Sequence, residues 1–520
     1  MRVQGRLVCL LVVGLLIGGP RRARADEVTR FEAGAPTTTP SKTRQLQPYL
    51  DRWATPEQDS VFRDPNLRSK YQGDLPFYQD WLFLNLELTV DAFFKRRENP
   101  DFRRGEKTQT FNQNNEFRRL ITLAGFELRN ADDVFKPATW RLRFIGAGAT
   151  DRDFNVVDNK GHGFAAVQEA FAEHEIFSLG ELDLSFLRAG IEPFKSEFHG
   201  LIFFDNAVGA RVFGEYSHNK YRYTLGAFRL FQKDPPTQLN DLGVPPKDEY
   251  VSVASLQVRD VTPGWNGEFV GHWDHNRQAQ ANAKAFDRDT FYGGSTFNGR
   301  LGVINFNPAA YFVGGRDNAA NKKILAGVAL LDAAYTLPMA DFVTLRSGYL
   351  FQSGDRNPKD RTETGFASIN DNVALFGAGA SYWTGEAINF NLAKGDKNAK
   401  TQLVKTNSAF VLPGNFNSPG VHLFNAGVLT KITQRLDHAL NLNYMMFAEP
   451  DGMAQLIGRP HVDRSIGLDV NTLFEWRPLQ QNTFVIDVAG SVLFPDTGFQ
   501  DVVGSRKAVY ALTTDMRFIY

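Results

Sequence analysis

Residues 84–91 have the sequence LNLELTVD, in which apolar and polar side chains alternate one by one. A period of two is that of a β-strand, because successive side chains point to opposite faces of the strand. An amphipathic helix would instead repeat its apolar stripe about every 3.6 residues. This stretch therefore predicts a strand with one apolar face and one polar face.

The same alternation returns near the end of the chain, in residues 440–446 (LNLNYMM) and 465–476 (SIGLDVNTLFEW). A soluble β-sandwich also alternates, but it buries its apolar faces against each other, and its aromatic residues would not gather at strand ends. The last stretch, residues 510–520 (YALTTDMRFIY), ends on the aromatic Tyr520. It resembles the closing strand of bacterial outer-membrane barrels, which implies the barrel assembly machinery as a partner that recognises Tyr520.

The composition excludes several classes of protein. The chain has 520 residues, 58 Lys+Arg against 58 Asp+Glu, and 42% hydrophobic residues, which does not fit a bundle of transmembrane helices. Aromatic residues make up 13%, which excludes a disordered chain. The single cysteine, Cys9, excludes a disulfide framework and a cysteine-based zinc site, and the neutral charge does not indicate nucleic acid.

The N-terminus has the pattern of an export signal. Arg2 and Arg6 precede the apolar stretch 7–17, and Ala23-Arg24-Ala25 fits a cleavage site. An uncleaved membrane anchor would need about 20 apolar residues. We therefore expect residues 1–25 to be a signal peptide, followed by a periplasmic lead-in at 26–80, rich in Pro, Thr and charge.

The alternating segments after residue 80 predict an all-β fold, a transmembrane antiparallel up-and-down β-barrel over residues 81–520. The gaps between them alternate in length, as the turns and loops of outer-membrane barrels do. We expect 18 strands, with 16 or 20 as the neighbouring possibilities, and a large outer loop or an extra hairpin at 354–419. The expected strands are about 81–95, 116–130, 138–150, 163–177, 182–193, 206–216, 219–231, 248–260, 264–275, 289–298, 302–315, 324–337, 341–353, 420–433, 437–448, 464–478, 482–494 and 506–520.

Membrane lipid is the solvent that such a barrel suits. In hydrocarbon every backbone N–H and C=O must be paired within the protein, and a closed sheet achieves this without an edge. Aromatic residues are expected in girdles at the headgroup level. They fall near the ends of the expected strands at Trp81, Trp140, Tyr216, Trp265, Trp273, Tyr335, Trp476 and Tyr520.

The polar faces of these strands carry charges of both signs. The inward-facing, pore-lining candidates are Glu87, Asp91, Arg141, Arg143, Glu169, Glu173, Arg211, Lys220, Arg222, Glu268, Arg346, Lys431, Asp469, Glu475, Asp515 and Arg517. Eight basic and eight acidic residues indicate no ion preference. Arg141 and Arg143 either form part of a basic ladder for anionic sugars or pair with Glu169 and Glu173 on the neighbouring strand, and pairing is favoured.

One part of the chain resembles a known group of proteins. The stretch from Gln168-Glu169-Ala170-Phe171 through 187–194 (LRAGIEPF) to 209–214 (GARVFG) is similar to the alginate-export and porin-like group of Gram-negative outer-membrane barrels. The resemblance implies a monomeric export or passive channel. The dipeptide Ile191-Glu192 stands where that group usually has Arg-Gln, which argues against alginate itself as the cargo.

No motif indicates an enzyme or a metal site. Asp151-x-Asp153-x-Asn155 begins like a calcium loop, but Val156 stands where the turn requires Gly. His272 and His275 have no third ligand at a suitable spacing. No GxSxG, HExxH, P-loop or GxGxxG motif occurs. We expect no cofactor and no catalytic residues.

Three classes of function remain for a barrel of this size. The first is a passive outer-membrane channel for small hydrophilic solutes or a polysaccharide, because a large barrel encloses an aqueous space. The alternative is a sheath or scaffold for a partner such as a multihaem cytochrome; no CxxCH motif occurs here, so the partner would carry the haems. A lipid-modifying barrel enzyme is disfavoured, because no catalytic cluster is indicated.

Overall fold

The computed structural model describes residues 75–78, 82–98, 114–130, 138–153, 161–179, 183–217, 219–234, 237–277, 287–338, 340–370, 376–377, 380–382, 389–391, 400–402, 416, 418–479 and 484–519. The predicted signal peptide, most of the predicted lead-in, Trp81 and Tyr520 lie outside these residues. Predictions about them stay predictions.

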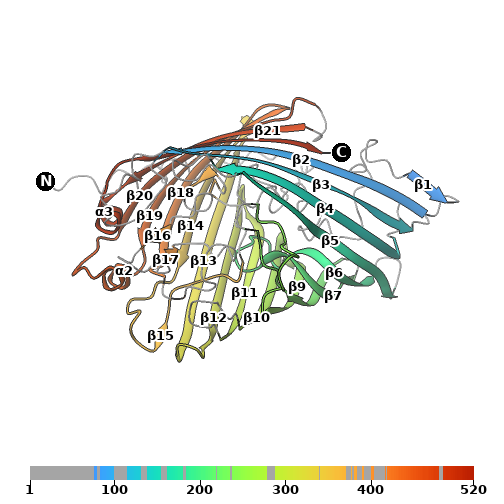
Figure 1. Ribbon diagram of the computed structural model, residues 1–520, viewed down its shortest axis with the longest axis horizontal. Coiled ribbons are helices and arrows are strands. Elements are labelled where there is room, and N and C mark those ends of the chain that lie inside the picture. Colours follow the sequence, from blue (N-terminus) through green and yellow to red (C-terminus); the bar gives the residue numbers. More distant parts are fainter. Residues whose placement is uncertain are drawn as a thin grey trace.

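The described strands form one closed antiparallel β-barrel of 18 strands, as expected (Figure 1). Each strand pairs with the next along the chain, and β2 pairs with β22 from Thr89↔Ile519 to Glu98↔Tyr510. This last pairing closes the sheet and leaves no barrel edge. The strands are β2 (Leu82–Glu98), β3 (Asn114–Asn130), β4 (Trp140–Asp153), β5 (Gly161–Ser178), β6 (Leu184–Lys195), β7 (Phe204–Tyr216), β8 (Tyr221–Arg229), β9 (Glu249–Thr262), β10 (Trp265–Asn276), β11 (Arg288–Leu301), β12 (Ile304–Asp317), β13 (Lys322–Leu337), β14 (Ala340–Gln352), β18 (Val421–Thr433), β19 (Leu436–Phe447), β20 (Ser465–Trp476), β21 (Phe484–Pro495) and β22 (Val509–Ile519).

The two ends of the barrel differ in their connections. At the short-turn end, two residues suffice at 263–264, 302–303 and 434–435. The long-connection end carries the segments 230–248 and 353–420. It also bears α2 (Pro450–Ile457), α3 (Thr497–Val503) and β15 (Thr362–Glu363), which lie away from the C-terminus in Figure 1. Among the described residues, no helix has the length and apolar character needed to cross a membrane.

The segment 354–419 adds no hairpin to the barrel within its described residues, because β14 pairs directly with β18. Its strand β15 lies parallel to β13, and β16 (Asn389–Asn391) and β17 (Lys400–Gln402) form a separate two-stranded sheet. One short strand, β1 (Leu75–Tyr78), lies in the predicted lead-in and pairs with β2. The strand count therefore stays at 18.

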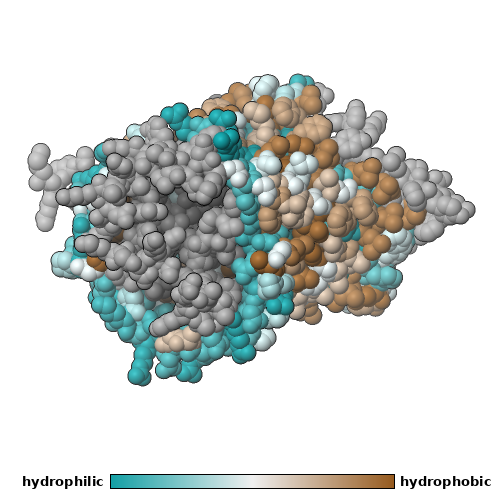
Figure 2. All heavy atoms as spheres, viewed as in Figure 1, coloured by the Kyte–Doolittle hydropathy of each residue, from teal (hydrophilic) through white to brown (hydrophobic). Residues whose placement is uncertain are grey.

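The outer surface of the barrel carries a broad apolar belt. Figure 2 shows hydrophobic residues concentrated on the half of the barrel towards the short-turn end. Phe312 and Leu325, for example, are 73% and 66% exposed. A soluble monomer usually exposes apolar residues singly and not as a continuous belt. Alternation places Leu86 outside at 48% exposure and Glu87 inside at 8%. An outer face of this kind suits contact with lipid chains.

Aromatic residues form a ring where the strands meet the short turns. Trp140 and Trp265 begin their strands there, and Tyr216 and Trp476 end theirs. Tyr335 lies close to the same end, on β13. Tryptophan and tyrosine prefer the boundary between hydrocarbon and headgroups, so this ring marks one edge of the apolar belt.

Leu331 is exposed near the middle of the belt, which makes it a direct test of lipid contact. Leu331→Arg is expected to reduce the stability of the folded barrel in lipid, measured as its free energy of unfolding, by about 2–4 kcal/mol, because a cation would face the bilayer interior. Urea titration in lipid vesicles measures this change. Leu331→Met keeps the apolar surface and should leave stability nearly unchanged; equal losses in the two variants would contradict a lipid-facing position.

Candidate functional site in the barrel interior

The inward faces of the barrel strands, termed the inner wall, hold most of the charged residues expected there. Lys220 and Lys431 are instead exposed, since they lie beside short turns at the barrel end. Arg141, Arg222 and Arg346 are partly buried. The fully buried members are Glu87, Asp91, Arg143, Glu169, Glu173, Arg211, Glu268, Asp469, Glu475, Asp515 and Arg517.

Arg143 on β4 binds carboxylates from three neighbouring strands. Its guanidinium donates hydrogen bonds to Glu87 on β2 at 2.6 Å, to Glu127 on β3 at 3.3 Å and to Glu169 on β5 at 2.5 Å. The Arg143 side chain is 0% exposed, and the three carboxylates are at most 8% exposed. A buried charge has lost its hydration and is stabilised mainly by its ion-pair partners. This cluster therefore connects β2, β3, β4 and β5 of the inner wall.

A second run of ion pairs continues around the wall. Arg141 and Arg188 both bind Glu173, at 2.7 Å and 2.5 Å. Arg188 also lies 3.3 Å from Glu192, which accepts a hydrogen bond from Arg211 at 2.9 Å. The chain of contacts therefore extends from β4 to β7.

Together these residues form what we term the arginine–glutamate network, which comprises Glu87, Glu127, Arg141, Arg143, Glu169, Glu173, Arg188, Glu192 and Arg211. Of the two arrangements expected for Arg141 and Arg143, the structure contains the pairing with Glu173 and Glu169. Glu127, Arg188 and Glu192 were not among the predicted residues. Period-two spacing along their strands would have found them, because it places them on the same face as their partners.

Elsewhere the predicted arginines bind carboxylates nearby on the wall. Arg346 lies 2.8 Å from Asp332, and Arg222 lies 2.6 Å from Glu215. Arg517 binds Asp487 on the adjacent strand at 2.9 Å. Charges on these strands are thus also balanced locally.

The opposite part of the wall, on β18 to β20, carries amides in place of charges. Asn425 donates to Asn443 at 2.7 Å, and Asn441 donates to Asn471 at 3.2 Å. Asp469, a predicted residue, accepts hydrogen bonds from Asn443 at 3.0 Å and Asn471 at 3.1 Å. This sector offers polar, mostly neutral groups to the interior.

The connection 196–203 between β6 and β7 folds onto the inner wall. Within it, the Glu197 carboxylate accepts backbone N–H bonds from His199 at 2.7 Å and from Leu201. Burial raises the pKa of Glu197, and these amide donors together with Lys195 oppose that rise. The predicted residue Glu268 on β10 accepts the Phe198 N–H at 3.0 Å, which anchors the connection to the wall.

A second inward segment comes from the long connection after β14. The Asn370 carbonyl accepts the Phe204 N–H at 2.7 Å, and the Asn370 N–H donates to the Ile202 carbonyl at 3.1 Å. Further along, the Phe376 carbonyl accepts the Asn443 side chain at 2.8 Å. A Cβ atom at Gly348 on β14 would overlap the Phe376 ring. The described parts of both connections thus occupy the barrel interior.

Strands β9 to β14 differ from the polar inner face that alternation predicts. On β12, Tyr311 and Val313 are 1% exposed on the inner side, whereas Phe312 faces outward. The reason is that the inward connections cover this sector, so apolar side chains on the inner face of these strands are buried against other apolar side chains. The apolar core inside the barrel includes Leu201, Ile202, Phe203, Val251, Val253, Tyr311, Val313, Ile324, Val328, Leu350, Phe366, Ile369 and Phe376.

Other buried polar atoms of the inner wall have no hydrogen-bond partner among the residues that the structure describes. Both side-chain amide atoms of Gln168 belong to this group, as do Asn206 Oδ1 and Asp332 Oδ1. Buried polar groups are almost always hydrogen-bonded, and ordered water commonly supplies the bond. These atoms indicate a hydrated interior beside the apolar core.

The histidines His272 and His275 lie on opposite faces of β10. Three positions apart on β10, His272 is buried inside, whereas His275 binds Asp289 at 2.5 Å on the other face. Within the described residues, no group of three or more His, Cys, Asp or Glu side chains is placed to hold a metal ion.

The sequence matches no protein-family model and no curated protein. Among solved structures, the chain is similar to Pseudomonas aeruginosa OccK2 (OpdF), with 12% identity over 84% of this chain and 97% of that chain, at a TM-score of 0.48. It is also similar to OpdK of the same organism in its structure with vanillate, with 9% identity over 84% and 98% of the two chains, at a TM-score of 0.47. Acinetobacter baumannii OccAB4 gives 8% identity over 84% and 97%, at a TM-score of 0.47. A likeness at this level does not carry function from those proteins to this chain.

Proposed function

We propose that the chain is a channel of the Gram-negative outer membrane that passes small hydrophilic solutes down their gradients. The observation that supports this most is the contrast between the two faces of a closed barrel. The outer face carries an apolar belt bordered at one edge by aromatic residues, and the inner wall carries ion pairs and hydrogen-bonded amides. Such a wall suits a water-filled path, and such an outer face suits lipid.

The interior contacts suggest what this channel would select. Most charges of the inner wall are neutralised by partners at hydrogen-bonding distance, which leaves no single-sign ring to prefer anions or cations. The described parts of the inward connections, 196–203 together with 366–370, 376–377 and 380–382, narrow the interior, so solute size would matter more than solute charge. We therefore infer weak ion selectivity and a small solute.

Two finer readings receive less support. An anionic polysaccharide, which the alginate-export resemblance suggests, would need cationic groups that turn towards the cargo, but Arg141, Arg143 and Arg211 already bind glutamates. A sheath for a cytochrome would need a wide interior, and the inward connections occupy part of it. The proposal is therefore a solute channel, without an enzymatic reaction.

Single-channel recording in planar bilayers tests the proposal. The purified protein is expected to give discrete open steps with weak preference between small anions and cations. Silence in the bilayer, together with a haem protein that co-purifies, would contradict the channel and favour the sheath.

A further inference from the structure

Exposed arginines gather on the outer face of β2 to β4, at the long-connection end. Arg118 on β3 and Arg152 on β4 are register partners across the strand pair, so both side chains point outward at the same level. Arg96 on β2 is also exposed. It follows Phe94, the register partner of Arg118, by two positions and so lies on the same outward face. The Arg118 side chain is 60% exposed while it binds Glu116 at 2.5 Å.

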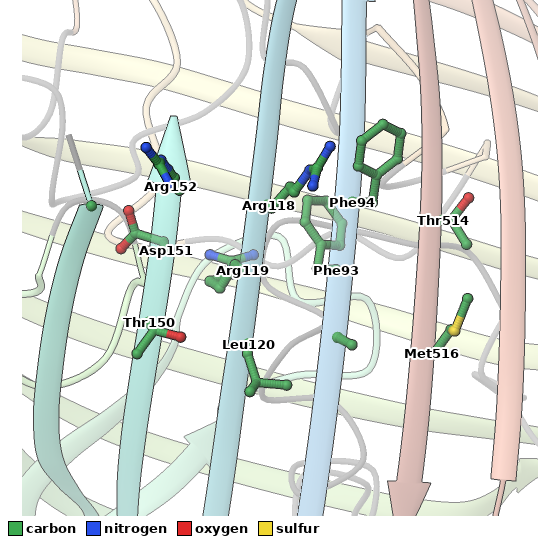
Figure 3. Close-up of a pocket in the computed structure, with 12 residues that line it drawn as sticks. Phe93, Phe94, Arg118, Arg119, Leu120, Thr150, Asp151, Arg152, Thr514 and Met516 are labelled. Carbon is green, nitrogen blue, oxygen red and sulfur yellow. The ribbon is translucent and has the colours of Figure 1, made fainter. Parts of the chain in front are cut away.

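A hollow of about 680 Å³ lies at these arginines (Figure 3). Two rows of outward residues line most of it, each running across neighbouring strands, and the buried residues Phe93, Arg119 and Asp151 complete the lining. The first row contains Thr514, Phe94, Arg118, Arg152 and Gly161, and the second contains Met516, Ala92, Leu120 and Thr150. Figure 3 shows Arg118 and Arg152 at one level of the barrel wall. Leu120, Thr150 and Met516 lie together at the next level. Small side chains at Ala92, Thr150 and Gly161 leave the space open.

The two rows differ in chemistry. The arginine row lies nearer the long connections, and the second row lies nearer the apolar belt, where Leu120 is 44% and Met516 is 43% exposed. A ligand that fits both rows carries negative charge at one end and hydrocarbon at the other. This is the chemistry of a phosphorylated lipid, with its headgroup towards the rim and an acyl chain along the belt.

We propose that this hollow binds the phosphorylated headgroup of a lipid in the outer leaflet, with Arg118 and Arg152 holding the phosphate. The inference rests on the membrane location proposed above, and it concerns the outer surface and not the channel. Neighbouring strands are about 4.8 Å apart, so two guanidinium groups on paired residues can bind one phosphate. Arginine forms paired, charge-assisted hydrogen bonds with phosphate oxygens.

The residues around the hollow support this assignment. The Phe94 ring lies 5.8 Å from the Arg118 guanidinium and gives the site an apolar edge. Glu116 competes for Arg118, so it should weaken phosphate binding without abolishing it. An arginine at the edge of the belt is also best placed to reach a headgroup, because its stem lies along apolar surface while its charge stays at the interface.

Lipid binding to the detergent-purified full chain tests the proposal, with diphosphorylated lipid A as the probe and phosphatidylcholine as the reference lipid. Native mass spectrometry measures the bound lipid. Wild type is expected to prefer lipid A, and Arg118→Gln/Arg152→Gln to bind it roughly 30-fold more weakly, since each basic residue near an anionic headgroup contributes about 1 kcal/mol. Arg118→Lys/Arg152→Lys should keep most of the affinity, and Glu116→Gln should increase it.

The matched control uses another pair of cations on the outer face. Arg316 and Lys323 are exposed register partners on β12 and β13, but the bulky Leu325 lies in the next outward row and Phe312 in the row after it. Arg316→Gln/Lys323→Gln removes the same charge and should leave lipid A binding unchanged. Equal losses in both double variants, or no loss in the Arg118/Arg152 variant, would overturn the site.

Two further readouts separate this proposal from others. Displacement of the bound lipid A by inorganic phosphate alone would assign the hollow to free phosphate and overturn the lipid proposal. The Arg118→Gln/Arg152→Gln variant should keep the single-channel conductance of wild type. Lost lipid preference with intact conductance supports the lipid site, whereas a silent wild type that still binds lipid A would overturn only the channel.

Discussion

Arg143→Met is expected to destabilise the barrel by about 3–5 kcal/mol, the largest loss of stability that we predict for a single substitution. The variant leaves Glu87, Glu127 and Glu169 buried and close together without their shared cation. Removing one partner of a buried pair is costly because the remaining charge has lost both its water and its counterion. Urea unfolding in lipid vesicles at neutral pH measures the change.

A matched variant shows whether burial causes the loss. Arg277 binds a single carboxylate, that of Asp287 at 3.5 Å, and the two side chains are 58% and 41% exposed. Arg277→Met should cost about 1 kcal/mol or less, since ion pairs near water contribute little. In the double variant Arg143→Met/Glu169→Gln, part of the lost stability should return. Equal losses for Arg143→Met and Arg277→Met would contradict the role of the buried network.

Gly348→Leu is expected to open the channel by displacing Phe376 from the inner wall. Even a Cβ atom at position 348 would overlap the Phe376 ring, so the side chain and the ring cannot both stay in place. Overpacking of this kind costs about 1–3 kcal/mol, which shifts the ratio of displaced to docked segment by roughly 5- to 150-fold. Single-channel recording should show larger or longer open steps than in wild type.

The controls for this prediction use a second glycine and the ring itself. At Gly293, on the outer face of β11, an added Cβ would meet open space, so Gly293→Leu should leave conductance unchanged. Phe376→Ala should enlarge the open steps by itself, because it removes the ring that packs at Gly348. A Gly348→Leu channel with wild-type conductance would show that this segment does not narrow the path.

The strands could be predicted from the sequence because lipid and a closed sheet impose a strict pattern. Residues 84–91 alternate since one face of β2 belongs to the exposed apolar surface of the barrel and the other faces the interior. The same reasoning found the pairing of Arg141 with Glu173, since both side chains lie on inward faces of adjacent strands. The strand number followed from counting the alternating segments, with parity requiring an even number, whereas 354–419 remained either one loop or an extra hairpin until the structure paired β14 with β18.

The apolar inner face of β9 to β14 could not be predicted from alternation. Tyr311 and Val313 face inward, where alternation in a water-filled barrel predicts polar side chains. Their apolar character makes sense only with Ile202 and Phe203 folded against that part of the wall. Period two tells which side chains share a face, but not what covers the face.

The sequence by itself determined the class of fold, a count of about 18 barrel strands and the face on which most strand residues lie, because these depend on local alternation and on the need to pair every backbone group. Only the tertiary structure decided which charges meet, such as Arg143 with Glu87 from a strand two positions away, and which connections enter the barrel. The physical reason is that side-chain reach across several strands and the folding of long connections depend on contacts between residues far apart in the chain, which no local period records.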